Sequence, residues 1–141
     1  MVTREDLRKY CDYLNDLAAM DLRIETLYNT YRSPQISGDG SSRPSSPGDP
    51  VWSAYQRIEK AKQTREELRA KIQEIEDFVE SIEDPRERAI CNLHYLSGLT
   101  WSATCYQLRK HYSITVVTRY DNDWWNNYEK ECLKSPNNDE S

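Results

Sequence analysis

Hydrophobic positions recur at heptad spacing near the start of the chain and predict a long helix over residues 3–32. Thr3 is the expected N-cap, and Asp6 three positions later completes a capping-box-like arrangement. Asp21 interrupts the apolar seam, where it either fixes the register or the oligomeric state, or lies at the edge of the seam. The apolar seam positions are Leu7, Tyr10, Leu14, Leu17, Ile24, Tyr28 and Tyr31.

A second helix with the same seam is predicted from about Val51 to Ile82, with Arg65 as its polar exception. Its apolar seam positions are Ala54, Ile58, Ala61, Leu68, Ile72, Ile75, Val79 and Ile82. Residues 33–50, SPQISGDGSSRPSSPGDP, lie between the two helices and have the Gly, Ser and Pro content of a flexible loop. Because the helices are similar in length, we expect residues 1–83 to form an antiparallel hairpin, closed within one chain or between two.

Residues 84–133 predict three shorter helices joined by tight turns. Asp84 and Pro85 suit the N-cap and first position of a helix that ends at Gly98. Thr100 is the expected N-cap of the next helix, over residues 101–110.

Ser113 caps the last predicted helix, which runs to about Leu133 and precedes a disordered tail at residues 134–141. Its expected buried stripe is Val116, Val117, Tyr120, Trp124 and Tyr128. The predicted fold is therefore all-α: a long coiled-coil-like hairpin followed by a C-terminal helix-turn-helix, the arrangement that places one helix against a DNA major groove.

The segment LHYLSGLTWSATCYQL resembles the pattern (L)xYxxGxSWxxIAxxL of phage-encoded regulators related to region four of sigma factors. These include the ArpU-like and RinA-like late-transcription activators and related phage proteins. The matching positions are Leu93, Tyr95, Gly98, Thr100, Trp101, Cys105 and Leu108, followed by Ser113, Val117, Arg119 and Trp125 in the next helix. The resemblance extends over nearly the whole chain and is stronger after Asp84.

The resemblance implies a phage or prophage transcriptional regulator that binds double-stranded promoter or operator DNA, with the helix from Ile114 as its recognition helix. Such proteins usually act as homodimers. Arg119 suits a guanine edge or a phosphate, and Asn122 suits adenine. The residues expected to contact bases are Ser113, Thr115, Thr118, Arg119 and Asn122, and those expected to hold phosphates are Arg109, Lys110 and His111.

The chain departs from the family pattern within the recognition helix and just before it. Asp121 and Asp123 stand where polar or basic residues are usual, and exposed carboxylates there would repel phosphate. Thr104 replaces an apolar residue, which buries a hydroxyl unless it bonds back to a carbonyl. Trp124 cannot point inward together with Trp125, so it predicts a dimer contact or an anchor for a partner.

Overall charge keeps an alternative open. The formal net charge is −5 and the pI about 5.1, which argues against non-specific coating of nucleic acid. An acidic phage protein of this kind could instead bind and inhibit a host nucleic-acid-binding protein, in the manner of anti-CRISPR and anti-defence proteins. Asp121, Asp123 and Trp124 would then contact the partner, a host defence nuclease; under the regulator hypothesis the further partner is the host RNA polymerase.

The sequence predicts neither catalysis nor a cofactor. His94 and His111 have no nearby cysteine or carboxylate pattern, and the four cysteines lack zinc-type spacing and are expected to be reduced. We therefore expect no catalytic or metal-binding residues and no enzyme activity. No apolar run approaches membrane-spanning length, and the first residues lack a signal peptide's apolar core, so the expected location is the bacterial cytoplasm.

Overall fold

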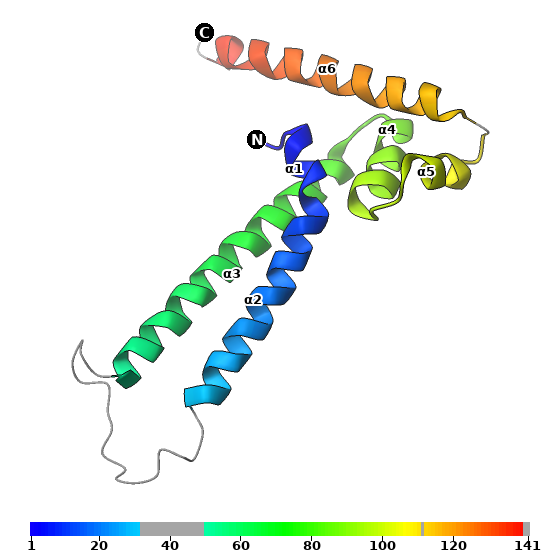
Figure 1. Ribbon diagram of the computed structural model, residues 1–141. Coiled ribbons are helices and arrows are strands. Elements are labelled where there is room, and N and C mark those ends of the chain that lie inside the picture. Colours follow the sequence, from blue (N-terminus) through cyan, green and yellow to red (C-terminus); the bar gives the residue numbers. More distant parts are fainter. Residues whose placement is uncertain (32–49, 111, 140–141) are drawn as a thin grey trace. The chain divides into compact units, whose positions relative to one another are not determined.

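The computed structural model describes residues 1–31, 50–110 and 112–139, and every regular element in these ranges is helical (Figure 1). The predicted all-α class is therefore confirmed. The chain divides into two compact units: the first contains Met1–Cys11 and Glu74–Ser141, and the second contains Asp12–Gln73. The loop predicted at residues 33–50 lies almost wholly outside the described residues.

The predicted N-terminal helix is divided into α1 (Arg4–Arg8) and α2 (Tyr10–Tyr31). The capping box is present, because the Asp6 amide donates to Thr3 Oγ1 at 3.2 Å and the Thr3 amide donates to Asp6 Oδ2 at 2.9 Å. Lys9 separates the helices with φ −92° and ψ −1°, although its amide still bonds to the Glu5 carbonyl at 3.0 Å.

The two polar exceptions in the predicted seams lie opposite each other in the second unit. Asp21 on α2 forms ion pairs of 3.5 Å with Arg65 and 3.8 Å with Arg69, both on α3 (Pro50–Ser81). The Lys62 ammonium lies 5.1 Å from the centre of the Tyr28 ring. A later residue of α2 therefore contacts an earlier residue of α3, as in an antiparallel pair of helices.

Most of the predicted seam positions that can be assessed in the second unit are shielded from solvent. Leu14 is the exception, with 38% of its surface exposed, so its assignment to a buried seam is wrong. The fully or nearly buried seam residues are Ile24, Ala54, Ile58, Ala61 and Ile72. Small alanines at two of these positions allow the two helices to approach closely.

The C-terminal helices begin at the predicted caps. The Asp84 carboxylate accepts from the Arg86 amide at 3.0 Å, Thr100 Oγ1 accepts from Ala103 at 3.1 Å, and Ser113 Oγ accepts from Val116 at 3.2 Å. The helices are α4 (Pro85–Ile90), the π-helical segment η1 (Cys91–Leu96), α5 (Trp101–Gln107) and α6 (Ile114–Asp139). The last helix continues past its predicted end near Leu133.

Gly98 ends η1 in the left-handed region, with φ +74°. The Ser97 amide bonds to the Asn92 carbonyl at 2.9 Å, and the Leu99 amide bonds to the Leu93 carbonyl at 3.1 Å. This closing pattern needs a positive φ, which glycine adopts without steric cost. The predicted C-terminal cap is thus confirmed.

An aromatic cluster packs around Trp125 in the first unit. Trp125 is completely buried and stacks on Phe78 with ring centres 5.8 Å apart, which confirms its predicted core position. Tyr128 meets Phe78 edge-on at 5.2 Å. Within the described ranges, none of the helices has the length and apolar character needed to cross a membrane.

Candidate functional site

The turn before α6 and the first turns of that helix carry most of the predicted DNA contacts. Thr118 is half-buried, and His111 lies outside the described residues. The exposed members of the predicted set are Arg109, Lys110, Ser113, Thr115, Arg119 and Asn122. The predicted residues are therefore largely on the surface, two of them in the turn before α6 and the others at or near the start of that helix.

Some of these polar side chains form hydrogen bonds within α6, and others form none with described residues. Ser113 Oγ caps α6, and Thr118 Oγ1 donates to the Ile114 carbonyl at 2.9 Å, so both hydroxyls act within the helix. Arg119 and Lys110 have no hydrogen bond or ion pair with any described residue. Their charges are available to an external ligand.

Apolar side chains lie beside this polar surface. Val116, expected in the buried stripe, is 48% exposed, and Ile114 is 47% exposed. Val117 takes the core position and is 2% exposed. The prediction was wrong at Val116 because adjacent helix residues point about 100° apart, and only one of the two valines can face the core.

Asp121 is completely buried, contrary to its predicted place on the exposed face of the recognition helix. Arg4 Nη2 donates to Asp121 Oδ2 at 2.9 Å, and the Tyr95 hydroxyl donates to the same oxygen at 2.6 Å. Arg4 also donates to the side-chain oxygen of Asn122 and, through Nε, to the Tyr95 hydroxyl at 3.2 Å. The Asp121 charge is thus balanced inside the protein.

A second buried acid lies beside this ion pair. Glu87 has no exposed surface, and the Cys91 thiol donates to Glu87 Oε1 at 3.4 Å. Burial, reinforced by hydrogen bonding and charge from Asp121, raises the pKa of Glu87 to about 10. Glu87 Oε2 and Asp121 Oδ1 are both buried with no other partner, so a protonated Glu87 can donate to Asp121.

The same three side chains could hold a metal ion. The nearest ligand atoms of Glu87, Cys91 and Asp121 all lie within 4.8 Å of one another, and a thiolate with two carboxylates suits zinc. However, burial raises the pKa of the Cys91 thiol, and Arg4 already supplies a positive charge to Asp121. A proton on Glu87 together with Arg4 balances the cluster. The sequence did not predict this cluster, because Asp121 is distant in the chain from Glu87 and Cys91.

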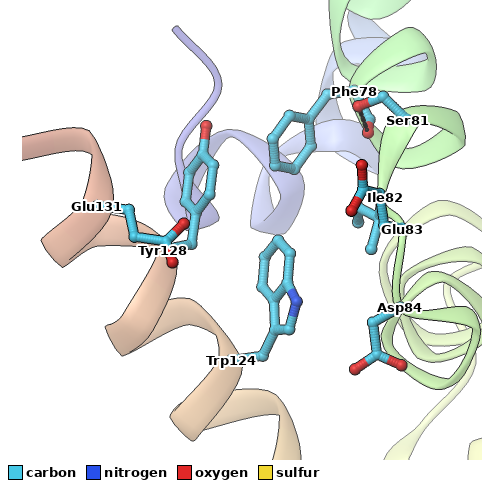
Figure 2. A pocket seen from close by; sticks show the side chains of 8 residues that line it. All are labelled: Phe78, Ser81, Ile82, Glu83, Asp84, Trp124, Tyr128 and Glu131. Carbon is cyan, nitrogen blue, oxygen red and sulfur yellow. Dashed lines mark hydrogen bonds between the residues drawn. The ribbon is translucent and has the colours of Figure 1, made fainter. Parts of the chain in front are cut away.

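Trp124 is half-buried at the wall of an open groove, shown in Figure 2. Its ring stacks on Tyr128 with centres 5.4 Å apart and an interplanar angle of 6°, and it meets Phe78 edge-on at 6.4 Å. The groove has a volume of about 590 Å³, and Glu83 and Glu131 also line it. Trp124 therefore contributes to a concave surface rather than standing free.

Thr104 and His94 both form hydrogen bonds to backbone carbonyls within the protein. Thr104 Oγ1 donates to the Thr100 carbonyl at 2.8 Å, the back-bond expected for a buried threonine. His94 stacks on Trp101 at 3.7 Å and bonds through Nδ1 to the Leu99 carbonyl at 2.8 Å, and burial lowers the pKa of its ring. All the cysteines are free, as predicted. Asp123 is exposed.

Comparisons with family models, curated proteins and solved structures give no match for this chain. The residues of α5, α6 and their surroundings are therefore the basis for a functional assignment.

Proposed function

We propose that the protein is a DNA-binding transcriptional regulator of phage or prophage type, in which α5 and α6 act as a helix-turn-helix after an antiparallel hairpin. The start of α6 would enter the major groove. One observation carries the proposal: Arg119 and Thr115 are exposed in the first turns of α6, and Arg109 and Lys110 are exposed in the turn before it, while Arg4 neutralises Asp121 in the interior.

The buried position of Asp121 removes the main electrostatic objection to DNA binding. A carboxylate on the exposed face of a recognition helix would repel phosphate oxygens. Asp121 is instead fully buried and receives hydrogen bonds from Arg4 and Tyr95. Of the two aspartates in this part of α6, Asp123 alone keeps its carboxylate exposed.

The surface residues suggest a division of roles on DNA. Arg119 would contact a guanine edge or a phosphate, while Arg109 and Lys110 would contact phosphates before the helix. Exposed Ile114 and Val116 suit apolar contact with thymine methyl groups. Asn122 is a weaker reader of adenine than predicted, because its side-chain oxygen already accepts a hydrogen bond from Arg4.

Arg119→Ala is expected to weaken specific DNA binding by about 1–3 kcal/mol because it removes the unpaired cation on the proposed reading face. Lys130→Ala is the matched control, since it removes an exposed cation farther along α6. Binding would be measured by fluorescence anisotropy against DNA fragments from the protein's genetic neighbourhood, across a salt series. Unchanged affinity in Arg119→Ala would exclude this residue, and absence of binding at low salt would reject the proposal.

A second candidate function is inhibition of a host nucleic-acid-binding protein, in which carboxylates of this protein take the place of nucleic-acid phosphates. The groove beside Trp124 favours it. Asp121 no longer supports this candidate because it is buried, which leaves Asp123 and Trp124. Asp123→Asn distinguishes the two functions without disturbing the core. It should strengthen DNA binding if the protein is a regulator, by easing repulsion, and weaken binding to the host protein if it is a mimic.

A further inference from the structure

The groove beside Trp124 combines aromatic ring faces with carboxylates of one sign. Trp124 and Tyr128 come from successive turns of α6, and Phe78 comes from the end of α3 (Figure 2). Glu83 and Glu131 reach the same opening, and none of the described residues that line it is basic. From this arrangement we infer that the groove binds an arginine side chain presented by a basic segment of a partner protein.

Two of the three carboxylates in the groove have no counter-charge among the described residues. Glu83 and Glu131 are exposed, and neither forms an ion pair or hydrogen bond with another described residue. Asp84 differs from them, because it caps α4 and accepts hydrogen bonds from the Arg86 amide and the Tyr120 hydroxyl. A concave surface with charges of one sign concentrates the opposite charge, so a cation is favoured over a phosphate.

The aromatic wall favours a guanidinium over other cations. The Trp124 ring, stacked on Tyr128, lines the groove, and tryptophan is the strongest partner in cation–π contacts. Arginine is planar, stacks on such rings and can form two parallel hydrogen bonds to one carboxylate. The groove volume of about 590 Å³ lies within the range of roughly 300–1,000 Å³ typical of ligand sites, enough for a side chain with part of its backbone.

This site is independent of the proposed DNA surface. The groove uses Trp124, Tyr128 and Glu131, whereas the proposed reading face ends before them on α6. Glu131→Gln should therefore leave DNA affinity as in the wild-type protein, apart from a small gain from the reduced negative charge. Failure of one proposal would not imply failure of the other.

The test is a titration of the full chain with a capped Gly-Arg-Gly peptide, followed by NMR of the tryptophan indole N–H groups. Trp124→Phe identifies the relevant resonance. We expect a saturable shift of the Trp124 signal, and binding about tenfold weaker for the peptide with neutral citrulline in place of arginine, because the charge is lost.

Two matched variants distinguish binding in the groove from non-specific attraction of the peptide to the negatively charged protein. Glu131→Gln should weaken arginine-peptide binding about threefold, whereas Glu129→Gln, an exposed carboxylate on the same helix but outside the groove, should leave it unchanged. Equal shifts with both peptides, or equal losses in both variants, would overturn the inference. A Trp124 shift that depends on protein concentration alone would assign the groove to a second copy of the chain.

Discussion

Replacing Arg4 with methionine is expected to lower the free energy of unfolding by about 3–5 kcal/mol, because the change leaves the buried Asp121 carboxylate without its counter-charge. Tyr95 and protonated Glu87 could still donate hydrogen bonds to Asp121, but neutral donors do not offset the full cost of a buried charge. The methionine side chain retains much of the aliphatic volume of arginine, so the expected loss is mainly electrostatic.

Urea denaturation monitored by circular dichroism would measure this effect. Arg8→Met is the control, since Arg8 lies on the same short helix, is exposed and, among the described residues, forms an ion pair only with exposed Glu5 at 3.5 Å. The double variant Arg4→Met with Asp121→Asn should recover much of the lost stability, because it removes the buried charge together with its partner. Equal losses in Arg4→Met and Arg8→Met would show that the buried pair contributes little.

Local signals in the sequence were sufficient to predict where several helices begin. Thr3, Thr100 and Ser113 cap helices as expected because a capping bond joins residues only two or three positions apart. The polar exceptions at Asp21 and Arg65 were also visible as breaks in the seams. Their mutual ion pair was not, since it depends on the register between two helices.

The environment of the candidate site depends on contacts that local spacing does not encode. Asp121 was predicted to be exposed from its place in the helix, but Arg4 and Tyr95 bind it from distant parts of the chain. The expected buried stripe named Trp124, but Trp125 is the tryptophan that is completely buried, while Trp124 is half-buried. The groove lined by Trp124 is also lined by Phe78, which lies on α3 and edge-on to the Trp124 ring. The helical pattern of α6 alone could not predict this contact.

The buried acid Glu87 should make stability decrease with rising pH. Its pKa is about 10 in the folded protein and near the ordinary value of 4.5 in the unfolded chain, so unfolding releases a proton between these values. The stabilising contribution is fully present below about pH 4.5 and is lost as pH rises towards 10, by at most about 1.4 kcal/mol per pH unit.

The other groups with shifted pKa values affect the free energy of unfolding mainly outside the pH range that reports on Glu87. The lowered pKa of His94 has the opposite effect on stability, but only below its ordinary value of 6.5. The raised pKa values of Cys91 and Tyr95 matter only above their ordinary values of 9.0 and 10.0. Measurements between about pH 7 and pH 8.5 therefore report mainly on Glu87.

Glu87→Gln should raise the free energy of unfolding by roughly 1–3 kcal/mol at about pH 8 and flatten its pH dependence, because the amide stays neutral in both states. The amide N–H group can still donate to Asp121, and its oxygen can still accept from Cys91, so the packing of the cluster is preserved. Glu129→Gln, an exposed control on α6, should change neither quantity. Denaturant titrations at each pH would measure both, and a wild-type slope retained in Glu87→Gln would show that the buried proton is held elsewhere.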